Sequence, residues 1–402
     1  MKDAKVLLVE NIHPTAVEAF QSAGFSVTSF KDSPPEAELI KMLPDYQVLG
    51  IRSKTQLTTK IIQACDHLYA IGAFCIGTNQ IDLATANRGG LPVFNAPYSN
   101  TRSVAELVIA EIIALARKLG DVSMAAHQKG WLKNAKGSFE VRGKTLGIVG
   151  YGHIGSQVSI LAEAMGLRVL YYDIVKKLPL GNAKPVDTLD QLFAESDFIT
   201  LHVPETPLTQ QMIGVEQLQA MKKPSYLINA SRGSVVDIPA LAAALKTGHV
   251  AGAAIDVFPY EPAGNKEAFV SELQGLNNVI LTPHIGGSTE EAQEAIGREV
   301  SYALIQFMLE GASRGAVNFP NVDVPPRLAP VRLINVHRNV PGVLGEINGI
   351  VSKVKGNIRA QYLSTDSEIG YMVMDIENVE GKLLADQVGK LSTSIKTHAI
   401  GD

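Results

Sequence analysis

The chain has 402 residues, of which 46% are hydrophobic and 19% charged, so it can form two or three folded domains and is not a disordered chain. Its 36 Lys and Arg residues against 40 Asp and Glu residues leave a formal net charge of −4, which argues against a nucleic-acid-binding protein because such proteins need a basic face. Two cysteines are too few for a disulfide framework, and no apolar run reaches the roughly 18 residues of a membrane span. The charged N-terminal sequence is not typical of a secretory signal. We therefore expect a cytoplasmic protein.

The first hundred residues alternate short apolar runs with amphipathic stretches. Strands are predicted at 5–10, 48–51, 68–74 and 93–96, and a helix at 14–23. Because the apolar runs are continuous, they favour a parallel sheet that is covered on both faces. A long helical pattern follows over 103–118, with Ser103 three residues before Glu106 in the spacing of a capping box. This helix is expected to lead into a second domain.

A second β/α rhythm begins near residue 144. Its strands are predicted at 145–149, 168–172, 198–201, 226–229, 250–256 and 279–281. Another long helix is predicted over 289–310. Two long helices that bracket one β/α unit imply that the first domain is discontinuous and that its tail returns after residue 286.

The C-terminal part follows a proline-rich segment. Residues 320–330 hold four prolines in eleven positions, which predicts an extended chain. Beyond it we expect strand 331–336, helix 342–355, strands 358–364 and 371–376, helix 383–391 and strand 395–400. This βαββαβ order is that of a ferredoxin-like domain. The sequence thus predicts an α/β protein with two doubly wound parallel-sheet domains, of the Rossmann or flavodoxin type, formed by residues 1–99 with 287–325 and by residues 100–286, and a ferredoxin-like domain over 326–402.

A glycine-rich loop stands between the first strand and the first helix of the middle domain. The sequence GYGHIG over 150–155 fits the pattern G-x-G-x-x-G in the strand–turn–helix context that dinucleotide binding needs. Gly150 permits a tight turn, Gly152 the approach of a pyrophosphate, and Gly155 close packing of helix on strand. Asp173 ends the next strand, where a carboxylate accepts hydrogen bonds from an adenosine ribose and repels a 2′-phosphate, which favours NAD over NADP. A βα turn without a ligand is the alternative, and two lysines that follow Asp173 leave the cofactor choice open.

Three polar residues, Arg232, Glu261 and His284, follow strands of the middle domain. In an open α/β sheet, ligands bind at the carboxyl ends of the strands. A guanidinium can hold a substrate carboxylate through two hydrogen bonds, an imidazole can take a hydroxyl proton, and a carboxylate can stabilise the imidazolium. Together the three residues therefore predict oxidation of a 2-hydroxy acid, although each alone is better explained without a function, a lone arginine as part of a surface ion pair and a lone histidine as a structural residue.

The segments GYGHIG (150–155), NASRGSVVD (229–237), DVFPYEP (256–262) and TPHIGGSTEEAQ (282–293) resemble the NAD-dependent D-2-hydroxyacid dehydrogenase family over essentially the whole chain. With the C-terminal domain, the resemblance narrows to the bacterial phosphoglycerate dehydrogenases. It implies oxidation of D-3-phosphoglycerate to 3-phosphohydroxypyruvate, the first step of L-serine synthesis, with reduction of 2-oxoglutarate as a side activity. It also implies that Arg232, Glu261 and His284 are catalytic. Further contacts with NAD are implied for His153, Ile154, Ala230, Ser231, Arg232, Asp256, His284, Ile285, Gly286 and Gly287.

The resemblance implies a separate group of residues for the substrate phosphate. Arg52, Lys54 and Lys133 match the basic residues of the family that face it, while Arg232 holds the carboxylate. Lys54 stands where close relatives often have Arg, so it supplies a point charge instead of a planar fork. Solvated surface charges remain the alternative for Lys54 and Lys133. Trp131, the only tryptophan, is expected to pack against a neighbouring subunit, and no metal site is expected.

The loop over 337–344 resembles the ligand loop of ACT domains, which bind amino acids between paired copies. The resemblance implies that His337, Asn339 and Asn357 hold serine across a dimer interface and that serine inhibits by restraining domain motion. An assembly domain without a ligand is the alternative. Pairing through these domains and through the nucleotide domains predicts a homotetramer.

Three other functions stay open at this point. The chain is alternatively a sister dehydrogenase that acts on glycerate or lactate, a non-catalytic regulator that senses NAD, or an amino-acid sensor whose ACT-like domain is the main functional part. Arg52, Lys54 and the C-terminal domain argue against the first. The intact set of Arg232, Glu261 and His284 and the lack of a basic surface argue against the second.

Overall fold

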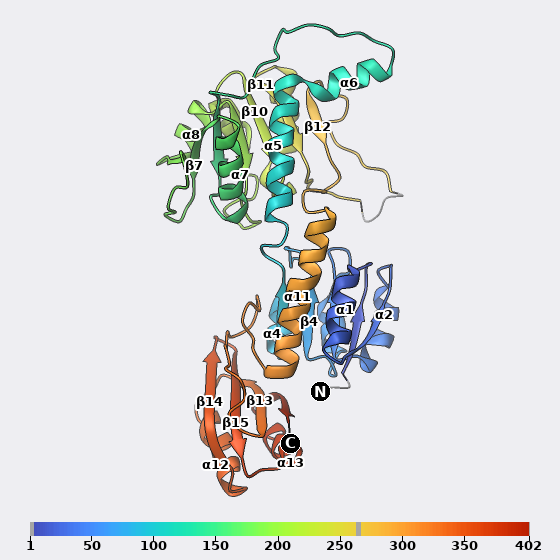
Figure 1. The fold of residues 1–402 in the computed structure, drawn as a ribbon, viewed down its shortest axis with the longest axis vertical. Coiled ribbons are helices and arrows are strands. Elements are labelled where there is room, and N and C mark those ends of the chain that lie inside the picture. The colour runs from blue at the N-terminus through green and yellow to red at the C-terminus, as the bar shows by residue number, and fades with distance from the viewer. Residues whose placement is uncertain (1–3, 263–266, 402) are drawn as a thin grey trace. The chain divides into compact units, whose positions relative to one another are not determined.

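The computed structural model describes residues 4–262 and 267–401. The chain forms two compact units: unit 1 is Met1–Ser99 with Gln293–Asp402, and unit 2 is Asn100–Ala292 (Figure 1). The chain enters unit 2 at residue 100 and returns to unit 1 at residue 293, and unit 1 includes the C-terminal domain. The division into three domains, 1–99 with 287–325, 100–286 and 326–402, stays a prediction.

The first sheet of unit 1 is parallel, with strand order β2-β1-β3-β4-β5. Its strands are β1 (Lys5–Leu8), β2 (Ser26–Ser29), β3 (Val48–Ile51), β4 (Ala70–Ala73) and β5 (Val93–Asn95), and its helices are α1 (Pro14–Ser22), α2 (Glu36–Met42), α3 (Thr59–Gln63) and α4 (Leu83–Arg88). Every residue of β3 and β4 is buried, which confirms the predicted sheet with two covered faces. The sequence prediction misses β2, because its half-polar residues lie at the edge of the sheet.

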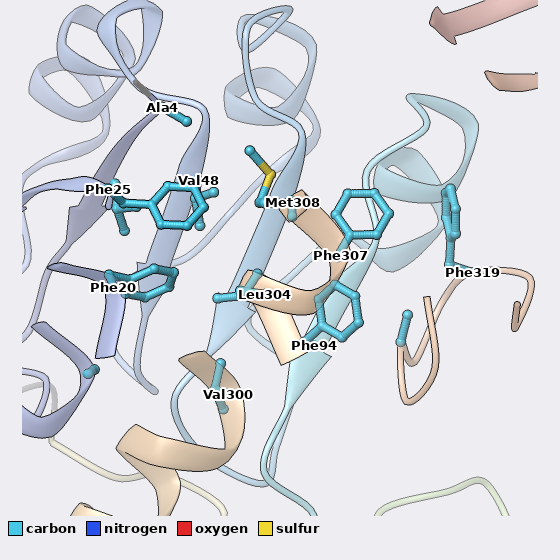
Figure 2. Packing of buried hydrophobic residues seen from close by; sticks show 14 of the residues in the cluster. Ala4, Phe20, Phe25, Val48, Phe94, Val300, Leu304, Phe307, Met308 and Phe319 are labelled. Carbon is cyan, nitrogen blue, oxygen red and sulfur yellow. The ribbon is translucent and has the colours of Figure 1, made fainter. Parts of the chain in front are cut away.

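Helix α11 (Glu290–Glu310) supplies the core of unit 1 beside this sheet. Val300, Leu304 and Phe307 are buried in one cluster with residues of β1, β3 and β4 (Figure 2). The rings of Phe94 and Phe307 lie 5.8 Å apart between centroids. Gly72 in β4 allows the close approach, since a Cβ at this position would collide with Leu304. Helix α11 therefore returns the chain to unit 1 by packing against the first sheet.

The second sheet of unit 1 is antiparallel, with order β14-β15-β13-β16. Its elements are β13 (Val331–Arg338), α12 (Val343–Lys353), β14 (Asn357–Thr365), β15 (Ile369–Glu377), α13 (Gly381–Gly389) and β16 (Ser394–Ile400), which confirms the predicted βαββαβ order. One face packs on the helices through Ile347 and Leu384. The other face contributes Ile334, Val336 and Tyr371 to the core around α11.

A buried ion pair attaches the proline-rich segment to this second sheet. Arg332 is fully buried, and its guanidinium donates hydrogen bonds of 2.6 and 2.8 Å to the two carboxylate oxygens of Asp375. It also donates to the backbone oxygens of Glu310 (2.9 Å) and Pro325 (3.0 Å). The segment 320–330 contains neither helix nor strand, as predicted, yet these bonds hold it in place.

Unit 2 contains a seven-stranded parallel sheet with order β12-β11-β10-β9-β6-β7-β8. The strands are β6 (Thr145–Val149), β7 (Arg168–Tyr172), β8 (Lys184–Pro185), β9 (Phe198–Leu201), β10 (Ser225–Asn229), β11 (Val250–Ile255) and β12 (Val279–Leu281). The helices are α5 (Thr101–Arg117), α6 (Leu119–His127), α7 (His153–Ala164), α8 (Leu189–Glu195), α9 (Val215–Ala220) and α10 (Ile238–Lys246). The strand order reverses between β6 and β9, so this is the doubly wound sheet whose switch point takes a dinucleotide.

The start and end of α5 differ from the prediction. The predicted capping box is wrong, because α5 begins at Thr101, the Ser103 hydroxyl bonds to Thr289 (2.8 Å), and Glu106 pairs with Arg102 (2.6 Å). At the other end, Lys118 adopts a left-handed conformation (φ +52°) and α6 begins at once. Helix α6 has no buried residue, and in Figure 1 it extends with the following loop away from the sheet of unit 2.

Candidate active site

The glycine loop of unit 2 has the shape that a dinucleotide needs. Gly150 has φ +92°, and a Cβ there would collide with the backbone oxygen of His202. A Cβ on Gly155 would collide with the backbone oxygen of Gly150, so α7 can pack closely on β6 only with glycine there. Gly152 instead faces open space, and α7 begins after it without a side-chain cap. The N-terminus of α7 is therefore suited to a pyrophosphate.

Asp173 lies at the end of β7 with its carboxylate turned to the glycine loop. One oxygen accepts the backbone N–H of Tyr151 (2.8 Å) and the other that of Val175 (2.9 Å). A carboxylate oxygen has a second acceptor position, so both oxygens can still receive a ribose hydroxyl. Lys176 and Lys177 are exposed, and neither forms an ion pair within the described ranges. These residues fit the adenosine and pyrophosphate of NAD.

Asp256 organises the loop that carries His284. It is 1% exposed, and its carboxylate accepts the Thr282 hydroxyl (2.6 Å) and the backbone N–H groups of Ile285 (2.8 Å) and Gly286 (2.9 Å). Its backbone oxygen accepts the N–H of His284 (2.8 Å). The structure thus assigns Asp256 to holding the loop, while its contact with a cofactor stays a prediction.

A second buried acid, which the sequence analysis missed, lies in the electric field of Asp256. Glu111 in α5 is 3% exposed, and neither of its carboxyl oxygens has a hydrogen-bond partner among the residues that the structure describes. Burial, together with the negative charge of Asp256, raises the pKa of Glu111 to about 8. Glu111 therefore keeps its proton at neutral pH. The helical spacing of Val104, Val108 and Leu115 places Glu111 on the buried face of α5, a signal that the sequence analysis did not use.

His284 and Glu261 form a hydrogen-bonded pair, with 2.9 Å between Nδ1 and Oε2. The hydrogen bond that His284 donates to Glu261 raises the pKa of His284, against the opposing effect of burial. Burial raises the pKa of Glu261, but the bonds from His284 and from the backbone N–H of Phe258 (3.1 Å) outweigh it and leave that pKa below its ordinary value. Nε2 of His284 bonds to none of the described residues, so it is available to a substrate.

Arg232 completes this group from the turn after β10. The Asn229 side chain shapes the turn: Oδ1 accepts the Ser231 N–H (3.1 Å) and hydroxyl (2.8 Å), and Nδ2 donates to the backbone oxygen of Arg232 (3.0 Å). The positive charge of Arg232 contributes to the low pKa of Glu261 and partly opposes the rise in the pKa of His284. The three groups therefore act on one another electrostatically. Unit 2 therefore brings the three predicted catalytic residues together.

The three candidate phosphate ligands are divided between the units. Arg52 and Lys54 lie in the loop after β3 in unit 1, and neither side chain forms an ion pair or a hydrogen bond within the described part of the chain. Lys133 lies in unit 2, on the exposed loop after α6. The role of all three in phosphate binding stays a prediction.

The candidate serine residues of the C-terminal domain are each engaged within the chain. His337 is 3% exposed, its Nδ1 lies 2.9 Å from Asn335 Oδ1, and burial lowers its pKa. Asn339 donates to the backbone oxygen of Asp366 (2.7 Å), and Asn357 donates to Glu377 (3.1 Å).

The strand register separates Asn357 from His337. On β15, His337 faces Gly370 and Asn357 faces Glu377. Gly370 and Glu377 are seven positions apart along the extended strand, which is about 23 Å. One chain therefore does not bring the three predicted serine residues together, and only an arrangement of two chains can do so.

The described residues contain neither a cluster of metal ligands nor a helix that could span a membrane. No group of three or more His, Cys, Asp or Glu side chains in this part of the chain could hold a metal ion. No described helix is long and apolar enough to cross a membrane.

Comparison with known proteins identifies the family. Residues 109–286 match the family model of the D-isomer specific 2-hydroxyacid dehydrogenase NAD-binding domain, and residues 333–396 match that of the AHAS small subunit-like ACT domain. The D-3-phosphoglycerate dehydrogenase of Dictyostelium discoideum is 54% identical over 396 residues, which are 98% of this chain and 97% of that protein. The Escherichia coli K12 enzyme of the same name is 53% identical over 374 residues, which are 93% and 91% of the two chains.

Solved structures agree with this assignment. The D-lactate dehydrogenase of Aquifex aeolicus, complexed with NAD and lactic acid, aligns with a TM-score of 0.68 at 31% identity and covers 79% of this chain and 100% of that chain. The glycine loop and Asp173 fit the same cofactor, NAD. The resemblance inferred from the sequence motifs is confirmed: the chain belongs to the D-3-phosphoglycerate dehydrogenases, NAD-dependent oxidoreductases of the D-2-hydroxyacid dehydrogenase family with a C-terminal ACT domain.

Proposed function

We propose that this chain oxidises D-3-phosphoglycerate to 3-phosphohydroxypyruvate with NAD, as the first step of L-serine synthesis. The observation that carries the proposal is the hydrogen bond between His284 and Glu261 within the field of Arg232. Because the enzyme draws on the cellular pool of NAD, we place it in the cytoplasm.

The three side chains divide the chemistry at C2 of the substrate. Bound NAD supplies the acceptor for the two electrons and the hydrogen that leave C2. Arg232 holds the substrate carboxylate, and Nε2 of His284 accepts the proton of the C2 hydroxyl. Glu261 keeps the other ring nitrogen protonated and stabilises the imidazolium that forms.

The opposite end of the substrate is a phosphate, which needs cations that are not already paired. Arg52 and Lys54 meet that condition within the described part of unit 1, and Lys133 is exposed in unit 2. Together they distinguish D-3-phosphoglycerate from D-glycerate or D-lactate. The second carboxylate of 2-oxoglutarate offers these cations a smaller anion, which supports reduction of 2-oxoglutarate as the side activity.

The proposed assembly is a homotetramer with two kinds of contact. Helix α6 and its following loop bury no side chain and expose Leu119 (54%), Met124 (57%) and Trp131 (85%). Apolar side chains at this exposure favour contact with a second copy of unit 2. The other contact joins the C-terminal domains through β14, an edge strand of its sheet.

The edge contact explains how serine binds. Antiparallel pairing of β14 with its own copy, centred near Gln361, places Asn357 of the partner subunit beside Thr365. Thr365 faces Gly370, and Gly370 faces His337. Serine held between the two subunits restrains the motion of the C-terminal domains, so it inhibits without occupying the active site.

The test is NAD reduction with D-3-phosphoglycerate, D-glycerate and D-lactate, each with and without serine. We expect the highest kcat/KM for D-3-phosphoglycerate and inhibition by serine that saturating substrate does not overcome. In the Asn357→Ala variant the inhibition is lost and dehydrogenase activity remains. Equal kcat/KM values for all three acids would contradict the proposed substrate.

A further inference from the structure

The loop that carries Arg52 and Lys54 is held by one buried acid, Glu10. Glu10 follows β1 and is 6% exposed. Its Oε1 accepts the backbone N–H groups of Arg52 (3.1 Å) and Thr55 (2.8 Å), and its Oε2 accepts that of Lys54 (2.9 Å). One carboxylate thus receives three backbone donors from a single turn.

The backbone at Glu10 is in a conformation that favours glycine. Glu10 has φ +65° and the next residue, Asn11, has φ +52°. Their N–H groups bond to the backbone oxygens of Asp32 (3.1 Å) and Phe30 (3.0 Å), which hold this geometry in place. Glycine would adopt it without strain but would supply no carboxylate. The presence of glutamate at such a position indicates that its side chain is needed.

Two further contacts secure the same loop. The Thr55 hydroxyl lies 2.7 Å from that of Ser33, and the Gln80 amide donates to the backbone oxygen of Arg52 (2.8 Å). All these contacts involve the backbone or Thr55, and among the described residues the Arg52 guanidinium and the Lys54 ammonium have no bonded partner. Glu10 therefore binds the loop without neutralising its cations through an ion pair.

We propose that Glu10 is a positioning residue for the substrate phosphate: by holding three backbone N–H groups, it sets the direction in which Arg52 and Lys54 leave the loop. The inference rests on the proposed function, in which these cations face the phosphate. It predicts that loss of the carboxylate weakens binding of the phosphate and leaves the chemistry at C2 unchanged.

The main variant is Glu10→Gln, which keeps the side-chain shape but turns an amide N–H group toward a backbone N–H. The control is Glu36→Gln, which removes a negative charge from an exposed position in the same unit. For each we measure kcat and KM for D-3-phosphoglycerate, kcat/KM for D-glycerate and KM for NAD. Calorimetry measures the binding of inorganic phosphate to each protein.

For Glu10→Gln we expect KM for D-3-phosphoglycerate to rise about tenfold, the loss of one hydrogen bond to a charged group. Its kcat, the KM for NAD and kcat/KM for D-glycerate stay within twofold of the wild type, phosphate binds about tenfold more weakly, and Glu36→Gln changes nothing. An unchanged KM and phosphate affinity overturn the proposal. An equal loss with D-glycerate and NAD also overturns it, because Glu10 is then only structural.

Two further arms keep the test decisive. If Glu10→Gln does not fold, Glu10→Asp keeps the charge but shortens the reach, and the same rise in KM is expected. If the wild type fails to prefer D-3-phosphoglycerate over D-glycerate, the proposed function fails. The affinity for inorganic phosphate then tests the role of Glu10 separately from the proposed substrate. Weaker binding in the variant supports the inference, and equal binding contradicts it.

Discussion

The proposed function assigns the two ends of the substrate to two regions of the molecule that are built differently. His284 and Glu261 are bonded to each other at 2.9 Å, whereas Arg52 and Lys54 have no bonded partner for their side chains among the described residues. A group that moves a proton needs a neighbour that adjusts its pKa. A group that binds an anion needs an uncompensated charge, so its position has to come from the backbone.

In both regions, however, a buried carboxylate holds the functional loop through its backbone N–H groups. Asp256 accepts backbone N–H groups from the loop of His284, and Glu10 accepts those from the loop of Arg52 and Lys54. A buried carboxylate that accepts several such hydrogen bonds fixes the turn that supplies the donors. Buried acids therefore set the shape of the loop in both regions. The two regions differ in the contacts of the side chains that face the substrate: His284 is bonded to Glu261, and Arg52 and Lys54 have no bonded partner among the described residues.

The largest effect, a loss of kcat, is expected on substitution of His284. His284 has φ +55°, so His284→Asn is a better substitution than one to alanine, since asparagine tolerates the left-handed conformation. Loss of the base lowers kcat by about 10²–10⁴. The affinity for NAD stays close to that of the wild type, because Asp256 still holds the loop. Steady-state kinetics and a fluorescence titration with NAD measure both, and turnover at the wild-type rate would refute the role of His284.

Glu261→Gln tests the pairing itself. The carboxylate raises the pKa of His284, so a neutral amide at this position lowers it. The free base then persists to lower pH, and the acidic limb of the kcat/KM profile moves to lower pH. The profile is measured with D-3-phosphoglycerate from pH 5 to 9. An acidic limb that stays where it is in the wild type would show that Glu261 has only a structural role.

Sequence patterns pointed to Glu261 and His284, but they did not show that Glu10 and Asp256 hold the loops in place. Arg232, Glu261 and His284 each follow a strand that a continuous apolar run predicts, so strand ends and chemistry coincide. The bonds from Glu10 to the 52–55 loop span 42 to 45 residues, and those from Asp256 to its loop span 29 and 30. An acid whose partners are distant backbone groups leaves no local pattern.

The same limit explains the errors in the fold. The spacing of Ser103 and Glu106 fits a capping box, but tertiary contact with Thr289 decides how Ser103 is used. Helix α5 ends at Arg117 because Lys118 adopts a left-handed conformation. A lysine in the sequence gives no indication of this conformation, which is more typical of glycine or asparagine. The continuous apolar strands of both parallel sheets, in contrast, are predicted within a few residues because burial on both faces dictates their composition.

Glu111→Gln tests the buried acid whose pKa the charge of Asp256 raises, and its effect is on stability. The pKa of Glu111 lies near 8 in the folded chain against 4.5 ordinarily, so the proton it retains stabilises the fold fully below about pH 4.5, and this stability is lost as pH rises to 8. The glutamine variant lacks this dependence. Relative to the variant, the free energy of unfolding of the wild type should fall by about 1.4 kcal/mol per pH unit in that window. Urea unfolding at pH 5, 6.5 and 8 measures it, and parallel curves would mean that Glu111 is ionised.

The contrast between the two ends is tested most directly by one ratio: kcat/KM for D-3-phosphoglycerate divided by kcat/KM for D-glycerate. It is measured in the wild type, in Arg52→Gln and in His284→Asn. Arg52→Gln should lower the ratio about 10- to 100-fold, because only the phosphorylated acid loses a charged hydrogen bond. His284→Asn should lower both values and leave the ratio unchanged. A ratio that Arg52→Gln leaves unchanged would contradict the separation of the two ends.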